Sequence, residues 1–170
     1  MKRILLSSFF ILIFTFISLG IAEWESVNPA IYPGRTSIEG TYKCSARKLA
    51  DGKKVKPPQI TGLLVFTEKY RQLNLSWTDD NGKLVSVSCI AEYTIDDKLY
   101  TEKNMFYCMT NETDGSTYDM SDLSASSEVT AKDGKISFKL PLHDKPLITV
   151  TRDHLVVKGQ EYTDYWKKVE

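Results

Sequence analysis

The sequence predicts an all-β protein whose main domain is an up-and-down antiparallel β-barrel of about 8–10 strands. Short segments rich in Val, Ile, Thr, Tyr and Phe follow one another from residue 38 onward. Turn pairs such as Asp51-Gly52, Asn81-Gly82 and Asp133-Gly134 separate them at fairly even spacing. Asn and Gly adopt the positive φ of tight hairpin turns at low cost. No segment shows a sustained helical period, so the pattern favours a meander closed into a barrel, with a two-sheet sandwich as the alternative.

Residues 1–22 have the pattern of a signal peptide. Lys2 and Arg3 are followed by an uncharged stretch that runs to Ala22, and small residues precede the end of this stretch. A basic start, an apolar middle and a small-residue exit are the features that the export machinery and signal peptidase recognise. We expect cleavage after Ala22, a secreted or periplasmic product, and no stable membrane insertion afterwards. A retained membrane anchor is the alternative.

The remaining chain is expected to hold an irregular leader and one domain. Residues 23–37 contain Pro29, Pro33 and Gly34, which resist regular structure. Residues 38–170 form the predicted barrel domain, a length that can bury a core of its own.

Alternation of apolar and polar residues predicts which side chains point inward. In the first strand Tyr42, Cys44 and Ala46 are expected inward, whereas Ser45 and Arg47 are expected outward. The other strands are expected over 60–67, 72–77, 84–95, 99–109, 135–140, 147–152, 155–158 and 161–169. Residues 111–130 are rich in Ser, Thr, Asp and Asn and are expected to form a long loop with one short strand.

The charge balance argues against nucleic-acid binding. Lys and Arg together number 22, as do Asp and Glu, and no basic run exceeds Lys53-Lys54. A nucleic-acid-binding protein normally concentrates basic residues on one face. The near-neutral balance fits a neutral or apolar partner, or none.

Three cysteines, Cys44, Cys89 and Cys108, follow the signal peptide and would reach an oxidising compartment. Three pairings are possible, and each leaves one thiol over. We expect a disulfide between Cys89 and Cys108, since they lie on neighbouring predicted strands. Three buried, reduced cysteines are the alternative.

Several short motifs resemble those of a known family. Gly40-Thr41-Tyr42 opens the first strand, Lys56-Pro57-Pro58 follows, and the run from Gly62 to Thr67 precedes Tyr70. Together with Trp166 near the end of the chain, they resemble bacterial lipocalin-like domains of the calycin superfamily. Tyr42 stands where that family usually has Trp, and Thr163-Asp164-Tyr165 copies a family triplet at a different place. The resemblance implies a barrel and a binding cavity, and no catalytic residue.

Nothing in the sequence indicates a catalytic or metal site, so we expect no enzyme activity, no metal and no cofactor. The two histidines, His143 and His154, lack partners at metal-binding spacing. His143-Asp144 lies between two prolines and is expected in a surface turn. The carboxylate pairs Asp79-Asp80 and Asp96-Asp97 fall at hairpin tips, where turn formation explains them.

Aromatic and aliphatic side chains on the inward faces are the candidates for a ligand-binding lining. Such residues combine apolar area with a few polar groups, which suits a small apolar molecule. The alternative is a solid core that needs the same volume for stability. The expected lining residues are Tyr42, Leu73, Leu75, Trp77, Val87, Tyr93 and Phe138.

These features favour an exported carrier or scavenger of a small hydrophobic ligand. Two other functions stay open. One is an exported protein-binding barrel, such as a hydrolase inhibitor, that acts through the loop over residues 111–122. The other is a calycin-type isomerase or cyclase.

Overall fold

The computed structural model describes residues 37–169. The signal peptide expected over residues 1–22 lies outside the described residues, as does the leader expected over 23–37 apart from Ser37. Within the described residues every regular element is a β-strand, and all strand pairs are antiparallel. The prediction of an all-β, up-and-down antiparallel fold is therefore confirmed.

The described chain forms thirteen strands in one sheet. They are β1 (Gly40–Leu49), β2 (Lys54–Val55), β3 (Ile60–Phe66), β4 (Tyr70–Thr78), β5 (Leu84–Ile95), β6 (Leu99–Asn111), β7 (Gly115–Asp119), β8 (Ser124–Glu128), β9 (Thr130–Lys132), β10 (Lys135–Lys139), β11 (Leu147–Val150), β12 (His154–Lys158) and β13 (Tyr162–Lys168).

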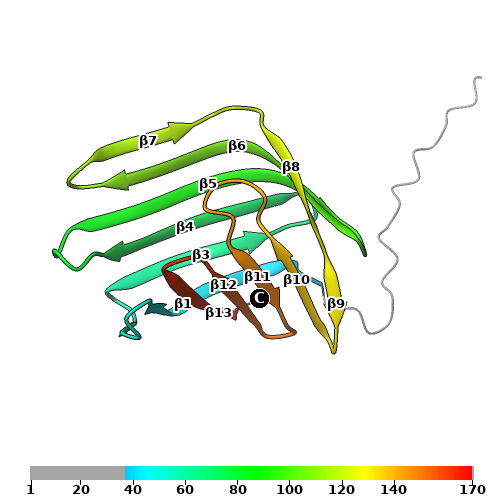
Figure 1. Ribbon diagram of the computed structural model, residues 1–170, viewed down its shortest axis with the longest axis horizontal. Helices are drawn as coiled ribbons and strands as arrows, with labels where there is room; N and C mark the ends of the chain where they lie inside the picture. The colour runs from blue at the N-terminus through cyan, green and yellow to red at the C-terminus, as the bar shows by residue number, and fades with distance from the viewer. Residues whose placement is uncertain (1–36, 170) are drawn as a thin grey trace, which may run out of the picture. The chain divides into compact units, whose positions relative to one another are not determined.

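Most strands pair with the next strand along the chain. The spatial order is β7-β6-β5-β4-β3-β1-β13-β12-β11-β10-β9, with β2 added to β1 and β8 to β6 (Figure 1). The pairing of β1 with β13 joins the first and last strands of the domain. Two meanders, β3 to β7 and β9 to β13, are thereby linked into one continuous sheet.

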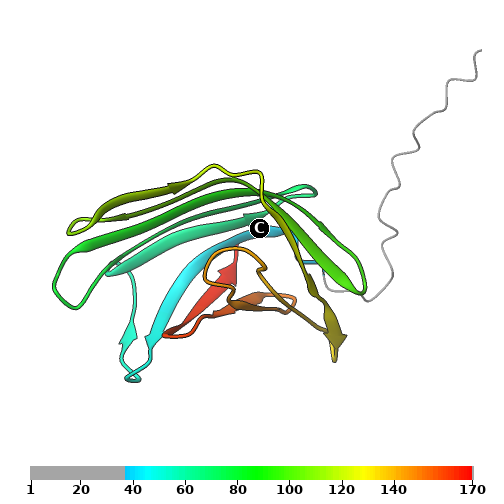
Figure 2. The same cartoon turned by 45° about the horizontal axis from the view of Figure 1, so that its top comes forward.

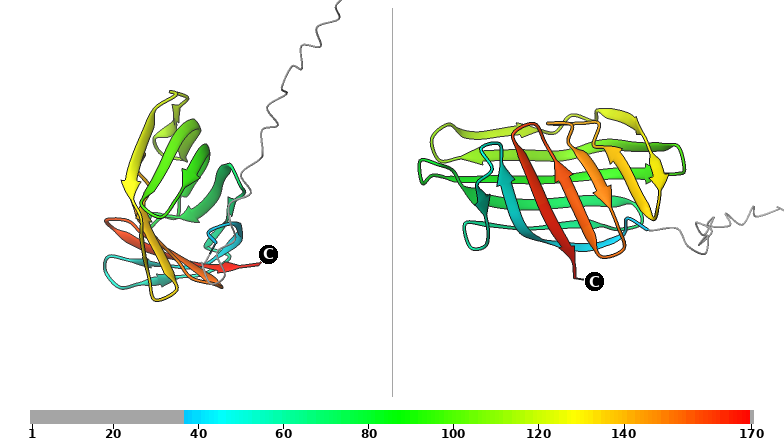
Figure 3. Two further views of the ribbon diagram at one scale, coloured as in Figure 1. Left: turned by 90° about the vertical axis from the view of Figure 1, so that its right-hand side faces the viewer. Right: turned by 60° about the horizontal axis from the view of Figure 1, so that its bottom comes forward.

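The sheet curls into a half-barrel. In Figure 2 the green and yellow strands arch over the orange and red ones, and Figure 3 shows β10 to β13 crossing the concave side of β3 to β6. Strand β8 reaches β10, where Ser127 Oγ donates a hydrogen bond to the carbonyl of Lys139. This curvature turns the inward side chains of both meanders toward one interior.

The region over residues 111–130 differs from the expected loop with one short strand. It contains β7, β8 and the first residue of β9. Strand β6 is 13 residues long and offers β7 and β8 pairing sites along its length. Strand β7 pairs with residues 107–111 of β6, whereas β8 pairs with residues 99–103. These short strands also explain why the strand count exceeds the predicted 8–10. Their polar side chains suit pairing at an edge, where one or both faces meet solvent.

The core lies between the two meanders and is rich in aromatic rings. Tyr42 meets Phe66 edge to face at 6.5 Å between ring centroids, and Phe66 meets Tyr93 in the same way at 5.5 Å. Tyr93 stacks on Tyr100 at 5.7 Å, and Tyr100 stacks on Phe138 at 4.3 Å. This row of rings joins β1, β3, β5, β6 and β10, so side chains fill this part of the interior.

Candidate functional site

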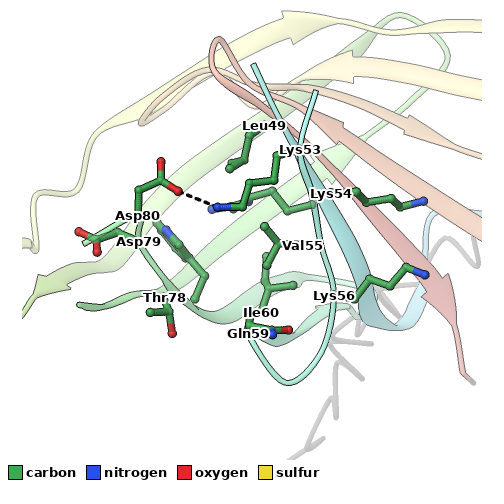
Figure 4. A pocket seen from close by; sticks show the side chains of 12 residues that line it. Leu49, Lys53, Lys54, Val55, Lys56, Gln59, Ile60, Thr78, Asp79 and Asp80 are labelled. Atoms are coloured by element: carbon green, nitrogen blue, oxygen red, sulfur yellow. Dashed lines mark hydrogen bonds and ion pairs between the residues drawn. The ribbon is translucent and has the colours of Figure 1, made fainter. Parts of the chain in front are cut away.

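A pocket of about 520 Å³ opens between the β1–β2 hairpin and the turn that joins β4 to β5 (Figure 4). Its apolar lining comes from Leu49, Val55, Ile60 and Trp77. Ile60 and Trp77 are direct cross-strand partners on β3 and β4, so they present one continuous apolar surface. We call this hollow the mouth pocket. Its polar lining consists of Arg47, Lys53, Lys54, Lys56, Gln59, Thr78, Asp79 and Asp80.

The guanidinium of Arg47 lies deepest among the charged groups of the mouth pocket, with only 5% of the residue exposed. Its Nε donates to Asp164 Oδ1 at 2.6 Å and its Nη2 to Asp164 Oδ2 at 2.8 Å. The guanidinium carbon lies 4.2 Å from the ring centroid of Trp77 and 4.5 Å from that of Tyr162. Burial raises the pKa of Asp164, and the hydrogen bond and charge of Arg47 oppose that rise.

A β-bulge in the first strand places Arg47 in the interior, contrary to the expectation that it points outward. Cys44 pairs with Trp166, but the next pair along the ladder is Ala46 with Tyr165, which leaves Ser45 as an extra residue. An extra residue reverses the side-chain alternation beyond it. Arg47 consequently faces inward opposite Asp164.

Charges of both signs surround the entrance of the mouth pocket. Lys53 Nζ lies 3.0 Å from Asp80 Oδ1, and both side chains are largely exposed (Figure 4). Asp79 accepts hydrogen bonds from the backbone N–H groups of Asn81 and Lys83, which shows that it holds the β4–β5 turn, as the sequence predicts. This mixture gives the entrance no strong preference for either charge.

A second buried ion pair lies farther along the concave face and is closed to ligands. Arg71 donates to both carboxylate oxygens of Glu102, at 3.0 and 2.7 Å, and to Cys89 Sγ at 3.0 Å. The hydroxyl of Tyr100 donates to Glu102 Oε2 at 2.6 Å. Arg71 and Glu102 are 3% and 1% exposed, and burial raises the pKa of Tyr100. The sequence held a signal for this pair, since Arg71 is in phase with the inward Leu73.

The segment over residues 141–146, here called the strap, contacts the interior of the half-barrel instead of forming the expected surface turn. The ring of His143 stacks on Tyr107 with 3.9 Å between centroids. His143 Nε2 lies 3.4 Å from Asn104 Oδ1 and 3.7 Å from Asp119 Oδ2. Burial lowers the pKa of His143, while the negative charge of Asp119 acts in the opposite direction.

The other side of the strap is anchored to β13. Asp144 Oδ2 accepts a hydrogen bond of 2.8 Å from the hydroxyl of Tyr162, the same ring that stacks on Arg47. His143, Asp144 and Lys145 all have positive φ, between 30° and 46°. Non-glycine residues adopt this conformation at an energetic cost. The contacts to β6 and β13 hold the strap in it.

The expected lining residues share the concave side, but they do not form a single cavity wall. Four of them are buried in the core: Tyr42, Leu75, Tyr93 and Phe138. Leu73 and Trp77 are partly buried and pack against that core, and Val87 is half-buried. Of the seven, Trp77 alone lines the mouth pocket, whereas Leu75 and Val87 border a more open hollow over β3, β4 and β5.

Apart from Trp77, the residues of the mouth pocket are not apparent from the sequence pattern. Leu49 and Val55 belong to the short β1–β2 hairpin, whose position across the pocket from the end of β4 is not visible in the local pattern. Alternation alone does not reveal a bulge, so it predicts the wrong face of the sheet for Arg47.

The expected disulfide between Cys89 and Cys108 is not formed, and Cys44, Cys89 and Cys108 are all free. Cys89 pairs with Tyr107, whereas Cys108 pairs with Ser88. Directly opposed residues share a face and sequence neighbours do not, so the two thiols lie on opposite faces of the sheet.

Among residues 37–169, no group of three or more His, Cys, Asp or Glu side chains is arranged to hold a metal ion. The same residues contain no helix of the length and apolar character needed to cross a bilayer.

Comparisons with protein families, with curated proteins and with solved structures found no match to this chain.

Proposed function

We propose that this protein is an exported carrier or scavenger that binds a small, mainly apolar molecule in the mouth pocket. The observation that carries the proposal is the apolar surface of Trp77, Ile60, Val55 and Leu49 around a hollow of about 520 Å³. Ligand pockets commonly measure about 300–1,000 Å³ and combine an apolar lining with a few placed polar groups. The half-barrel and the lipocalin-like motifs are consistent with this function.

The proposed ligand lies in the mouth pocket, and not in the barrel interior where the sequence pattern predicts it. The rings of Tyr42, Tyr93 and Phe138 occupy the interior that the sequence assigned to a ligand. Trp77 keeps its proposed role, because it packs against the core on one side and lines the mouth pocket on the other. Binding by burial requires no chemical step, which agrees with the proposed lack of enzyme activity.

Displacement of a neutral fluorescent dye, N-phenyl-1-naphthylamine, tests the proposal on the mature protein. We expect micromolar binding, and Trp77→Leu should weaken the affinity about tenfold by removing the largest apolar contact. The matched control is Leu63→Ser, since Leu63 is an exposed apolar residue on β3 that lies outside the mouth pocket. Dye binding weaker than about 100 μM, or equal losses in both variants, would refute the proposal.

A second candidate function is protein binding through the region that includes β7. Tyr118 lies on β7, a strand at the edge of the sheet, and Met120 follows this strand; they are 63% and 73% exposed. Aromatic residues and Met are enriched in protein interfaces, and an edge strand offers unpaired backbone groups. Inhibition of a purified hydrolase by the wild-type protein and by Tyr118→Ser tests this role. We expect weaker inhibition by Tyr118→Ser, and equal inhibition by the two proteins would contradict a role of Tyr118.

A further inference from the structure

We infer that the ligand of the mouth pocket is a planar apolar molecule that carries a neutral carbonyl oxygen, and that Arg47 is the residue that recognises this oxygen. The inference rests on the proposed binding function and names its ligand class. The protein uses only part of the hydrogen-bond capacity of Arg47.

Arg47 has donors that no described residue satisfies. A guanidinium carries five N–H donors, and Asp164 accepts one from Nε and one from Nη2. No acceptor within residues 37–169 bonds to Nη1. Although Arg47 is largely buried, Nη1 is not among the fully buried unpaired polar atoms of these residues, so it stays open to solvent. Because the guanidinium is planar, the N–H groups of Nη1 point away from the carboxylate that binds Nε and Nη2. Arg47 also lines the mouth pocket, so this edge is available to a molecule bound there.

The surroundings of Arg47 restrict the direction from which an acceptor approaches. Trp77 covers the guanidinium at 4.2 Å and Tyr162 at 4.5 Å. A ligand atom therefore reaches Arg47 in the guanidinium plane, at the Nη1 edge. A flat ligand can place an oxygen at this edge while its apolar body packs against Ile60 and the exposed part of Trp77.

The local charge favours a neutral acceptor over a carboxylate. Asp164 already neutralises Arg47 through two hydrogen bonds. At the entrance, Lys53 is paired with Asp80, and Asp79 adds a further negative charge. Lys54 and Lys56 also belong to the lining, but their side chains point away from the hollow in Figure 4, and Lys54 Nζ lies 5.3 Å from the ring centroid of Tyr165. A ligand carboxylate beside Arg47 would therefore meet no unpaired cation there, and burying an unpaired charge is costly. A ketone, ester or amide oxygen accepts from Nη1 without that cost.

Three naphthalene probes of similar size test the ligand class on the mature protein by isothermal titration calorimetry. They are methyl 2-naphthoate with a neutral carbonyl, 2-naphthoate with a carboxylate, and 2-ethylnaphthalene with no acceptor. We expect methyl 2-naphthoate to bind about tenfold or more tightly than 2-ethylnaphthalene, because a hydrogen bond to a buried charged donor is stronger than one between neutral groups. We expect 2-naphthoate to bind more weakly than its ester.

Two variants test the role of Arg47 in this preference. Arg47→Lys keeps a charge beside Asp164 but removes the planar Nη1 edge. The dissociation constants of methyl 2-naphthoate and 2-ethylnaphthalene should then become nearly equal. The double variant Arg47→Met/Asp164→Leu replaces the ion pair with apolar side chains, a change that proteins often tolerate, and should show the same loss. Circular dichroism confirms folding. Arg152→Lys, at an exposed arginine outside the mouth pocket, should keep the wild-type ratio.

The outcomes separate this inference from the proposed function. Equal binding of methyl 2-naphthoate and 2-ethylnaphthalene would overturn the inference and leave the carrier function standing. Tightest binding of 2-naphthoate would also overturn it, in favour of an anionic ligand. A preference that persists in both Arg47 variants would remove Arg47 from recognition. If no probe binds to a protein that does not bind the neutral dye either, both proposals fail.

Discussion

At the scale of single residues, the two buried arginines share a chemistry but differ in what they leave free. Arg71 uses Nε, Nη1 and Nη2 within the protein, through Glu102 and Cys89. Arg47 leaves Nη1 without a partner among the described residues. The hydrogen bonds of Arg71 are therefore made on all three nitrogens within the protein, whereas Arg47 keeps N–H donors that the described residues do not use.

The Arg71–Glu102 pair gives a residue-scale prediction. Glu102→Leu leaves the guanidinium buried and unpaired, and it should lower the free energy of unfolding by about 3–5 kcal/mol in urea denaturation. The double variant Arg71→Met/Glu102→Leu should recover most of this loss, since no charge then remains buried. Asp80→Asn, which breaks the exposed pair with Lys53, should have little effect. Similar losses for Glu102→Leu and Asp80→Asn would contradict this account.

At the scale of elements, the strap links parts of the sheet that belong to different meanders. It contacts Tyr107 and Asn104 on β6 through His143, and Tyr162 on β13 through Asp144. His143 is consequently the titratable group most able to couple pH to the stability of this link.

The strap predicts a pH dependence of stability. The pKa of His143 is lower in the folded protein than its usual value of about 6.5, because burial disfavours the charged ring. As the pH falls below about 6.5, the unfolded chain binds a proton before the folded one, so stability decreases until the folded-state pKa is reached. His143→Phe keeps a ring against Tyr107 and should flatten the fall in unfolding free energy between about pH 7 and pH 5.

His154, the only other histidine in the sequence, provides the control. It lies exposed at the start of β12, and His154→Gln should leave the pH slope of the wild-type protein in place. An unchanged slope in His143→Phe would show that the strap does not carry the pH dependence.

At the scale of the whole molecule, the curled sheet is a wall that separates an inner from an outer surface. Cys89 lies on the inner surface and is buried, while Cys108 is half-buried on the outer one. Cys44 is buried in the core, and burial raises the pKa of its thiol to about 12. We therefore expect the thiol of Cys108 to react faster than the buried thiols of Cys44 and Cys89.

Titration with 5,5′-dithiobis(2-nitrobenzoic acid) checks this arrangement. The native protein should react rapidly at one thiol, and that reaction should disappear in Cys108→Ser, because thiolate formation and access control the rate. Denatured, unreduced protein should show all three thiols. One thiol in the denatured state would instead indicate a disulfide and contradict the free cysteines.

Features that depend only on residues close together in the chain can be predicted from the sequence alone. The alternation along β5 and β10 indicates which side chains point inward, since successive side chains of a strand lie on opposite faces. The Asp133-Gly134 turn follows from the same local chemistry, and Gly134 has the expected positive φ of 72°. Fold class and most strand positions could be predicted for this reason.

The candidate site was decided by the tertiary structure. The bulge at Ser45 turns Arg47 inward, where Asp164 and Trp77 meet it, although each comes from a distant part of the sequence. Likewise His143 reads locally as a turn residue, and only the curl of the sheet brings Tyr107 beneath it. A bulge and a curl are set by the free energy of packing between strands far apart in the chain, and no local pattern encodes that sum.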